Sequence, residues 1–338
     1  MAKKPDISRF KKDVLKPYLE GHGEHGVVAD DLAARSIMPP LTATSRSFST
    51  VAHEFPEFYA DKCVACMECV ISCPESAMRA RVTPEKALEG ITNKFKYRFG
   101  KTQKYWQVIE KKGGTPALFS IWVDPDLCKG CAECVKVCGE HAALAMKPND
   151  EDRRKQAHLE TDFVNEVLPR TPPEYINERL LVDLFLQDEK WFYRGGSGSC
   201  MGCGEITALK MAMAVTAAKY GKNAVVVSAT GCNSVFSSTY PFNIFDIPWT
   251  NPLFENSPTT ALGVRLRLNQ TGKSDTKVWS IGGDGVSGSL GGKKRAGIVW
   301  RHRNEARQGI ACVYLQVVSG SRSDGGPTGG RRPPGPPN

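Results

Sequence analysis

The chain has 338 residues, 41% of them apolar, which is enough for two or three globular domains with ordinary cores. No apolar run approaches the roughly 20 residues that a membrane-spanning helix needs. The net charge of +9 is concentrated in residues 286–338, where nine Lys and Arg stand against two acidic residues. Because the rest of the chain is near neutral, the charge gives little support to a nucleic-acid-binding function.

Residues 1–54 are expected to form an arm that packs on a neighbour. A short helix is predicted over residues 7–15, and Pro17 is expected to interrupt it soon afterwards, because proline lacks a backbone donor and clashes with the preceding turn.

Residues 55–147 hold eight of the twelve cysteines in two copies of one pattern. Each copy reads C-x2-C-x2-C-x3-C, the spacing that binds [4Fe-4S] clusters, with three thiolates on one cluster and the fourth on the other. Structural zinc usually takes two separated C-x2-C pairs, and disulfide frameworks belong to short secreted chains, so both alternatives fit less well. We therefore predict an α+β ferredoxin-like domain of the bacterial two-cluster type, with the ligands Cys63, Cys66, Cys69, Cys73, Cys128, Cys131, Cys134 and Cys138.

The cysteine pattern also predicts the compartment. A chain with many unpaired thiolates and no export signal in its first residues is expected in a reducing cytoplasm.

Each cysteine run is followed by a helix-compatible stretch, residues 75–78 and residues 140–146, which suggests a repeated unit of strand, cysteine loop and helix. Between the runs lie 54 residues that are rich in Lys and aromatic side chains, among them Phe95, Tyr97 and Trp106. We expect this insert to pack against a partner subunit. Residues 148–191 are predicted to be a linker that ends in an amphipathic helix over residues 178–186.

Residues 192–285 have the pattern of an α/β domain with a parallel sheet. A glycine-rich loop at residues 195–205 leads into a helix over residues 206–220, with Ile206, Leu209, Met213 and Ala217 on one face. Two β-branched strands, residues 223–228 and 277–281, end in loops that contain Cys232 and Asp284. Ligands of such sheets bind at the carboxyl ends of the strands, so both loops are expected at one crevice.

The turn Gly283, Asp284 and Gly285 suits a metal-bound diphosphate, because glycine lets backbone N–H groups approach phosphate and a carboxylate binds Mg²⁺. Taken alone, each signal has another interpretation. Cys200 and Cys203 could be a redox dithiol or half of a zinc site, Cys232 a buried apolar residue, and the glycine turn an ordinary tight turn.

Together, the two cysteine runs, residues 198–205, residues 229–232, residues 248–256 and residues 283–285 resemble pyruvate:ferredoxin oxidoreductase and the 2-oxoacid:ferredoxin oxidoreductase family. The resemblance implies a thiamine-diphosphate enzyme that decarboxylates a 2-oxoacid and passes electrons through [4Fe-4S] clusters while the acyl group goes to coenzyme A. It further implies that Cys200, Cys203 and Cys232 ligate a third, proximal cluster. Glu205 and Cys232 would line the thiamine pocket, with Glu205 catalytic, and Asp284 would hold Mg²⁺ between Gly283 and Gly285.

Three features depart from that family. The only cysteine after residue 285, Cys312, stands in no matching context for the fourth proximal ligand, and the expected asparagine ligand for Mg²⁺ is missing from the window near residues 307–312. From Val286 the chain becomes basic and rich in Gly and Pro, a composition that cannot bury a core. We therefore expect a disordered tail at residues 286–338, and we hypothesise that the reading frame is truncated or shifted near Val286.

The resemblance also implies partners. The chain lacks the family's thiamine-pyrimidine domain, so a second subunit is expected to carry it, with ferredoxin or flavodoxin as electron acceptor. Two other functions stay open: a non-catalytic carrier that uses only the two ferredoxin-type clusters, and nucleic-acid binding through the basic tail.

Overall fold

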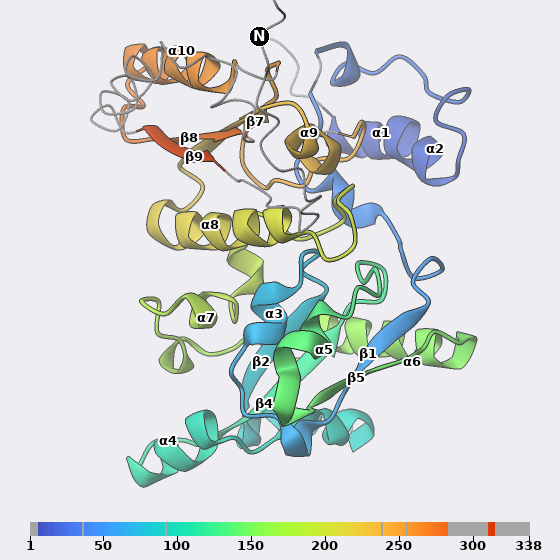
Figure 1. Ribbon diagram of the computed structural model, residues 1–338, viewed down its shortest axis with the longest axis vertical. Helices are drawn as coiled ribbons and strands as arrows, with labels where there is room; N and C mark the ends of the chain where they lie inside the picture. Colours follow the sequence, from blue (N-terminus) through green and yellow to red (C-terminus); the bar gives the residue numbers. More distant parts are fainter. Residues whose placement is uncertain are drawn as a thin grey trace, which may run out of the picture.

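The computed structural model describes residues 6–35, 37–91, 93–237, 239–253, 256–282 and 310–314. Two packed units account for most of them, one that carries the cysteine runs and one built on a parallel sheet, with α8 (Gly204–Tyr220) lying between them (Figure 1). Within the described residues, no helix has both the length and the apolar character to cross a membrane.

The unit with the cysteine runs, residues 54–148, is mixed α and β. Its strands β1 (Glu54–Phe58) and β5 (Leu144–Pro148) pair antiparallel, so the two ends of the unit lie together. A second sheet has the order β2-β4-β3, with β2 (Met78–Pro84) and β3 (Phe99–Gly100) both antiparallel to β4 (Ala117–Val123). The helices of this unit are α3 (Glu68–Ser72), α4 (Val108–Lys111) and α5 (Glu133–Cys138).

The helices predicted after each cysteine run are wrong. Helix α3 and helix α5 lie inside the runs, and the chain continues from each run into a strand, β2 or β5. The physical reason is the four-residue spacing of the third and fourth cysteines, which is one helical turn. The stretches that follow are short, and pairing in a sheet outweighs their helix propensity.

The aromatic insert packs within this chain. Phe95 and Trp122 form one cluster with Phe163 from the following segment, and Tyr105 stacks on Phe119 with ring centroids 5.7 Å apart. The expectation of a partner subunit on these buried rings is therefore wrong, because the chain itself covers them.

Residues 148–191 are also more than a linker. Helix α6 (Glu151–Asp162) and the π-helical turn Phe163–Val167 pack on β4, and Glu160 forms a buried ion pair with Arg98 at 2.5 Å. The expected amphipathic helix is reduced to α7 (Leu181–Leu184). Short 3₁₀ or π turns connect the elements at Ala33–Arg35, Thr42–Ser45, Ala60–Lys62, Glu85–Leu88, Asn93–Arg98, Gln103–Gln107, Gly139–His141, Pro173–Tyr175 and Asp188–Lys190.

The second unit contains a parallel sheet with the order β7-β6-β8-β9, as expected of an α/β domain. Its strands are β6 (Ala224–Ser228), β7 (Trp249–Thr250), β8 (Lys277–Gly282) and β9 (Ile310–Tyr314). The helices are α8, α9 (Cys232–Ser237) and α10 (Ser257–Gln270). Ser228 lies beside Ile281 in the register, so the predicted strand ends meet at one edge.

Helices cover the two faces of this sheet (Figure 1). The predicted apolar face of α8 is confirmed, since Ile206, Leu209 and Met213 are fully buried against Val226. The next residue of β6, Val227, points the other way and packs with α10 through Ala261. This alternation is the period of two that a strand imposes.

Part of the predicted disordered tail is a strand. Residues Ile310–Tyr314 pair in parallel with β8 and extend the sheet, so the expectation of disorder is wrong for this segment. The five β-branched, apolar or small residues of this strand can pair with the edge of β8 even though the flanking composition is basic.

The N-terminal arm packs on the sheet unit of the same chain. Its helical turns are α1 (Ile7–Phe10), Lys11–Leu15 and α2 (Lys16–Leu19). They run on through Pro17 without the predicted interruption, because the proline lies in the first turn of α2, where its missing N–H is tolerated. Phe10 and Leu15 are buried in a cluster that Phe242 joins, and the backbone N–H of Ala43 donates to Asn243.

Candidate active site and cysteine cavities

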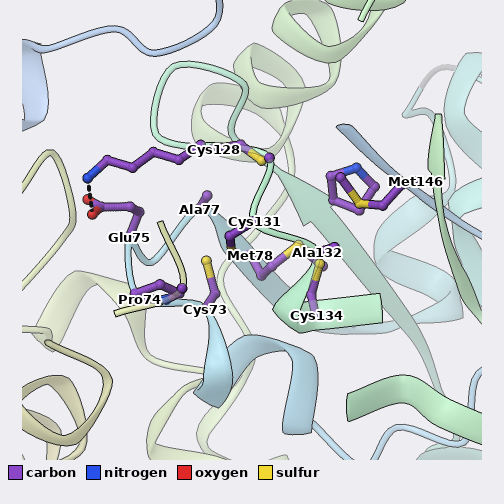
Figure 2. A pocket seen from close by; sticks show the side chains of 14 residues that line it. Cys73, Pro74, Glu75, Ala77, Met78, Cys128, Cys131, Ala132, Cys134 and Met146 are labelled. Atoms are coloured by element: carbon purple, nitrogen blue, oxygen red, sulfur yellow. Dashed lines mark hydrogen bonds and ion pairs between the residues drawn. The ribbon is translucent and has the colours of Figure 1, made fainter. Parts of the chain in front are cut away.

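The eight cysteines of the two runs line two separate cavities. The first contains three cysteines of the second run and one of the first run (Figure 2), namely Cys128, Cys131, Cys134 and Cys73. The second contains Cys63, Cys66, Cys69 and Cys138. Each cavity is thus lined by three cysteines of one run and the fourth cysteine of the other, as the spacing predicts.

Short helices distribute the sulfurs between the cavities. Cys69 lies in α3 and Cys73 follows as its C-cap, yet they face different cavities. Cys134 and Cys138 both lie in α5, and they also face different cavities. The fourth cysteine of each run is therefore carried across by one turn of helix.

Burial makes most of the cysteine thiols that line the two cavities harder to ionise. Among the described residues, no group of three or more His, Cys, Asp or Glu side chains is arranged to hold one metal ion. Burial raises the pKa of Cys63 to about 11 and that of Cys128 to about 12, and it also raises the pKa of Cys69, Cys73 and Cys134. Such thiols become thiolates only when nearby positive charge compensates, and bound iron would supply that charge.

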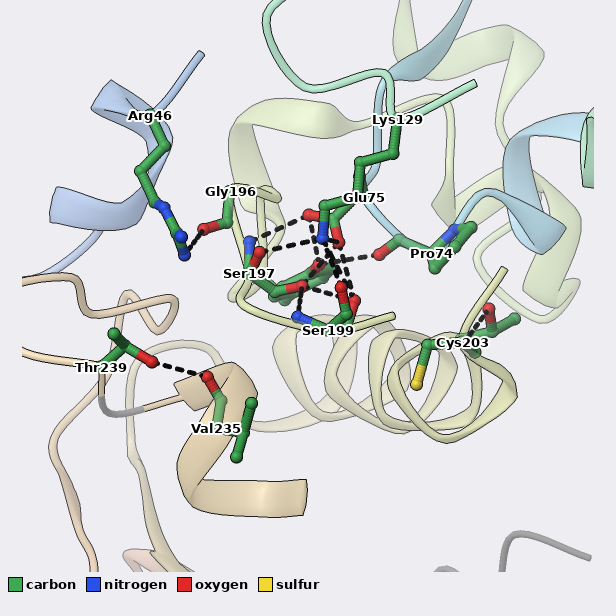
Figure 3. A network of polar contacts seen from close by, with 12 residues as sticks. Arg46, Pro74, Glu75, Lys129, Gly196, Ser197, Ser199, Cys203, Val235 and Thr239 are labelled. Carbon is green, nitrogen blue, oxygen red and sulfur yellow. Dashed lines mark hydrogen bonds and ion pairs between the residues drawn. The ribbon is translucent and has the colours of Figure 1, made fainter. Parts of the chain in front are cut away.

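A buried carboxylate joins the first cavity to the glycine-rich loop (Figure 3). One oxygen of Glu75 accepts from the Lys129 ammonium at 2.7 Å and from the Ser199 hydroxyl at 2.8 Å. The other accepts from the backbone N–H of Ser197 at 2.9 Å and from the Tyr193 hydroxyl at 3.4 Å. The Lys129 ammonium and the Ser197 backbone N–H can only donate, so both oxygens of Glu75 act as acceptors in this network.

The same loop approaches its neighbours through glycine. Gly196 has a φ of +77°, and a Cβ there would lie 1.9 Å from the carbonyl oxygen of Ala43. Gly202, between Cys200 and Cys203, lines the first cavity, so the C-x2-C loop borders the cysteine runs.

We expect Gly196→Ala to lower the free energy of unfolding by at least about 2 kcal/mol, because a left-handed residue and a backbone clash add together. Urea unfolding of the two chains measures the difference. Gly272→Ala is the matched control, since Gly272 has a φ of +74° but open space around its Cβ position. Equal losses in the two variants would contradict the role of the clash.

The residues assigned to the proximal site come together at the start of two helices. Cys203 is the N-cap of α8, Glu205 lies in its first turn, and Cys232 begins α9. Partial burial and the charges of Glu205, Cys203 and Cys200 raise the pKa of Cys232, so these four groups are electrostatic neighbours. Cys200 and Cys232 are exposed, whereas Glu205 is buried.

The carboxyl edge of the sheet has polar groups beside this site. The Asn251 amide donates to the backbone oxygens of Ser228 and Ala229 and so holds the end of β6. Within the described residues, the buried Ser228 hydroxyl and Asn233 amide oxygen have no hydrogen-bond partner. These polar atoms fit a polar ligand at this edge. Gly283, Asp284 and Gly285 lie outside the described residues.

Sequence reasoning missed three charged residues, Glu75, Lys129 and Lys210. A signal existed for Lys210, which occupies the i+4 position of the apolar stripe that starts at Ile206. Burial lowers the pKa of Lys210 to about 8, partly offset by the nearby Cys73 and Cys69.

Comparison with known proteins finds relatives among pyruvate oxidoreductases. It is 29% identical over 279 residues to the pyruvate-flavodoxin oxidoreductase of Nostoc sp., covering 78% of this chain and 21% of that protein. It is 34% identical over 116 residues to pyruvate synthase subunit PorB of Methanothermobacter marburgensis, covering 34% of this chain and 39% of that subunit. No family profile matches the chain. These similarities support a relationship to the 2-oxoacid:ferredoxin oxidoreductase family.

A further relative covers more of the chain. The pyruvate-flavodoxin oxidoreductase of Rhodospirillum rubrum is 26% identical over 336 residues, covering 95% of this chain and 26% of that protein. The hypothesis of a truncated or shifted reading frame near Val286 stays a prediction. The chain spans about a fifth of the length of the first of these relatives.

Proposed function

We propose that this chain forms the electron-transfer and diphosphate-binding part of a 2-oxoacid:ferredoxin oxidoreductase, with pyruvate as the 2-oxoacid. The observation that carries the proposal is the pair of four-cysteine cavities, the first of which borders the Cys200 and Cys203 loop. Two of the relatives are a pyruvate-flavodoxin oxidoreductase and a pyruvate synthase subunit, which supports the choice of pyruvate.

In this proposal, Cys73, Cys128, Cys131 and Cys134 hold one [4Fe-4S] cluster and Cys63, Cys66, Cys69 and Cys138 hold another. Cys200, Cys203 and Cys232 contribute to a proximal cluster. Thiamine diphosphate supplies the carbanion chemistry of decarboxylation, and the clusters carry single electrons. Gly202 lines the first cavity and Glu205 follows it at the start of α8, an arrangement that suits electron transfer from the Glu205 region to that cavity.

The residues of the chain have separate tasks. Glu205, buried at the start of α8, is the candidate acid or base at the thiamine site, with Cys232 beside it. Asp284 is proposed to bind Mg²⁺, flanked by Gly283 and Gly285, whose lack of side chains leaves room for the diphosphate. A partner subunit with the thiamine-pyrimidine domain, coenzyme A, and ferredoxin or flavodoxin would complete the reaction.

Metal analysis of the anaerobically purified chain tests the clusters. We expect about twelve iron atoms per chain, with matching acid-labile sulfide, if all three clusters assemble, and about eight if only the two cavities are filled. Zinc in place of iron, or a colourless protein, would reject the proposal.

An anaerobic assay tests the reaction. The chain, the partner subunit and coenzyme A are expected to reduce a viologen dye when pyruvate is added. Eight irons without dye reduction by any 2-oxoacid would support the second candidate, a non-catalytic two-cluster electron carrier, which the two cavities alone are sufficient to explain.

A further inference from the structure

Lys210 is a buried cation that links the two units. It lies on α8 of the sheet unit with 2% of its surface exposed, and its ammonium donates to the backbone oxygens of Val70 at 2.7 Å and of Cys73 at 2.5 Å. Both acceptors belong to the first cysteine run. The ammonium also lies 5.1 Å from the centre of the Phe185 ring.

The charge of Lys210 lacks a carboxylate partner among the described residues, whereas the nearby Lys129 is paired with Glu75. Two carbonyl dipoles do not neutralise an ammonium that burial has removed from water. A compensating negative charge must lie close to it. The negative groups that act on the ammonium are Cys73 in the first cavity, Cys69 in the second and, third in effect, Glu75, which is already paired with Lys129.

We propose that Lys210 is the counter-charge of the cluster held by Cys73, Cys128, Cys131 and Cys134, and that it raises the reduction potential of that cluster. The inference rests on the proposed function, because it needs a cluster in the first cavity. Reduction adds one negative charge to a group that is already anionic. A fixed positive charge in a medium of low dielectric constant therefore stabilises the reduced form more than the oxidised form.

The position of Lys210 on α8 relates its charge to electron transfer. Helix α8 begins at the candidate proximal site, with Cys203 and Glu205, and two turns later it places Lys210 against the next set of cysteines. One helix thus contributes to the site that would release electrons and sets how readily the neighbouring cluster accepts them. Lys210 is a positioning residue for charge and contacts no substrate.

The test compares midpoint potentials in full-length chains purified without oxygen. Lys210→Met removes both charge and hydrogen bonds, and Lys210→Gln keeps a donor but removes the charge. Lys219→Met, an exposed lysine on the same helix, is the control. EPR-monitored titration is expected to show reduction at least tenfold less favourable, or about 59 mV lower, in both Lys210 variants for the cluster whose signal Cys128→Ala removes, and no change in the control.

The outcomes separate the two proposals. A wild-type chain without iron would reject the proposed function, whereas iron-loaded variants with unchanged potentials would overturn the role of Lys210. If the midpoint potential shifts in Lys210→Met but not in Lys210→Gln, the effect comes from the hydrogen bonds, and the role of the Lys210 charge is also overturned. If neither neutral variant retains iron, Lys210→Arg decides: retained iron supports the charge, and lost iron contradicts it.

Discussion

Replacing Cys73 and Cys128 by alanine together is expected to remove about four iron atoms per chain, no more than either replacement alone. The two cysteines belong to different runs but line the same cavity, so both changes open the same cluster. Iron and acid-labile sulfide analysis of the anaerobic chains measures the loss.

The reciprocal pair is the matched control. Cys63 and Cys73 belong to the same run but line different cavities, so replacing both is expected to remove about eight iron atoms. If the pair from one run lost four and the pair from one cavity lost eight, each run would hold its own cluster and the three-plus-one arrangement would be wrong.

Glu75→Gln is expected to loosen the glycine-rich loop by about 3 kcal/mol, the lower end for breaking a buried ion pair. The Glu75 and Lys129 side chains are only 3% and 10% exposed, so water cannot replace the lost charge. Whichever way the amide is turned, its NH₂ group faces a donor, either Lys129 or the backbone N–H of Ser197. Hydrogen exchange of the Ser197 amide should accelerate about a hundredfold.

Glu68→Gln provides the control for this change, because Glu68 is an exposed residue of the same cysteine run. It is expected to leave exchange in the loop unaltered. An unchanged Ser197 amide in Glu75→Gln, or equal acceleration in both variants, would show that the carboxylate does not hold the loop.

Local patterns were enough to predict several elements. The apolar face of α8 and the strands β6 and β8 follow from periodicity and β-branched runs, and all three are present within about two residues of their expected bounds. The spacing of the two cysteine runs likewise predicted how the eight cysteines divide between the two cavities. These features depend on residues close in sequence, where spacing translates directly into geometry.

Other features could not be predicted because their partners are distant in sequence. No local pattern distinguishes Glu75 from other acidic residues, because its partner Ser197 lies more than a hundred residues later in the chain. The aromatic insert was expected to meet another subunit because nothing local shows that Phe163 would cover Phe95. Strand β9 forms in a segment whose flanking residues are basic, because its backbone can pair with the edge of β8.

By itself, the sequence determined how the eight cysteines of the two runs divide into two sets, because cysteine spacing is a local property. Only the tertiary structure decided that α8 runs past these sets and places Lys210 behind Cys73, and that Glu75 ties the first set to the Cys200 and Cys203 loop. Electrostatic and packing interactions of that kind depend on distance through space, and the chain establishes those distances only when its two units fold against each other.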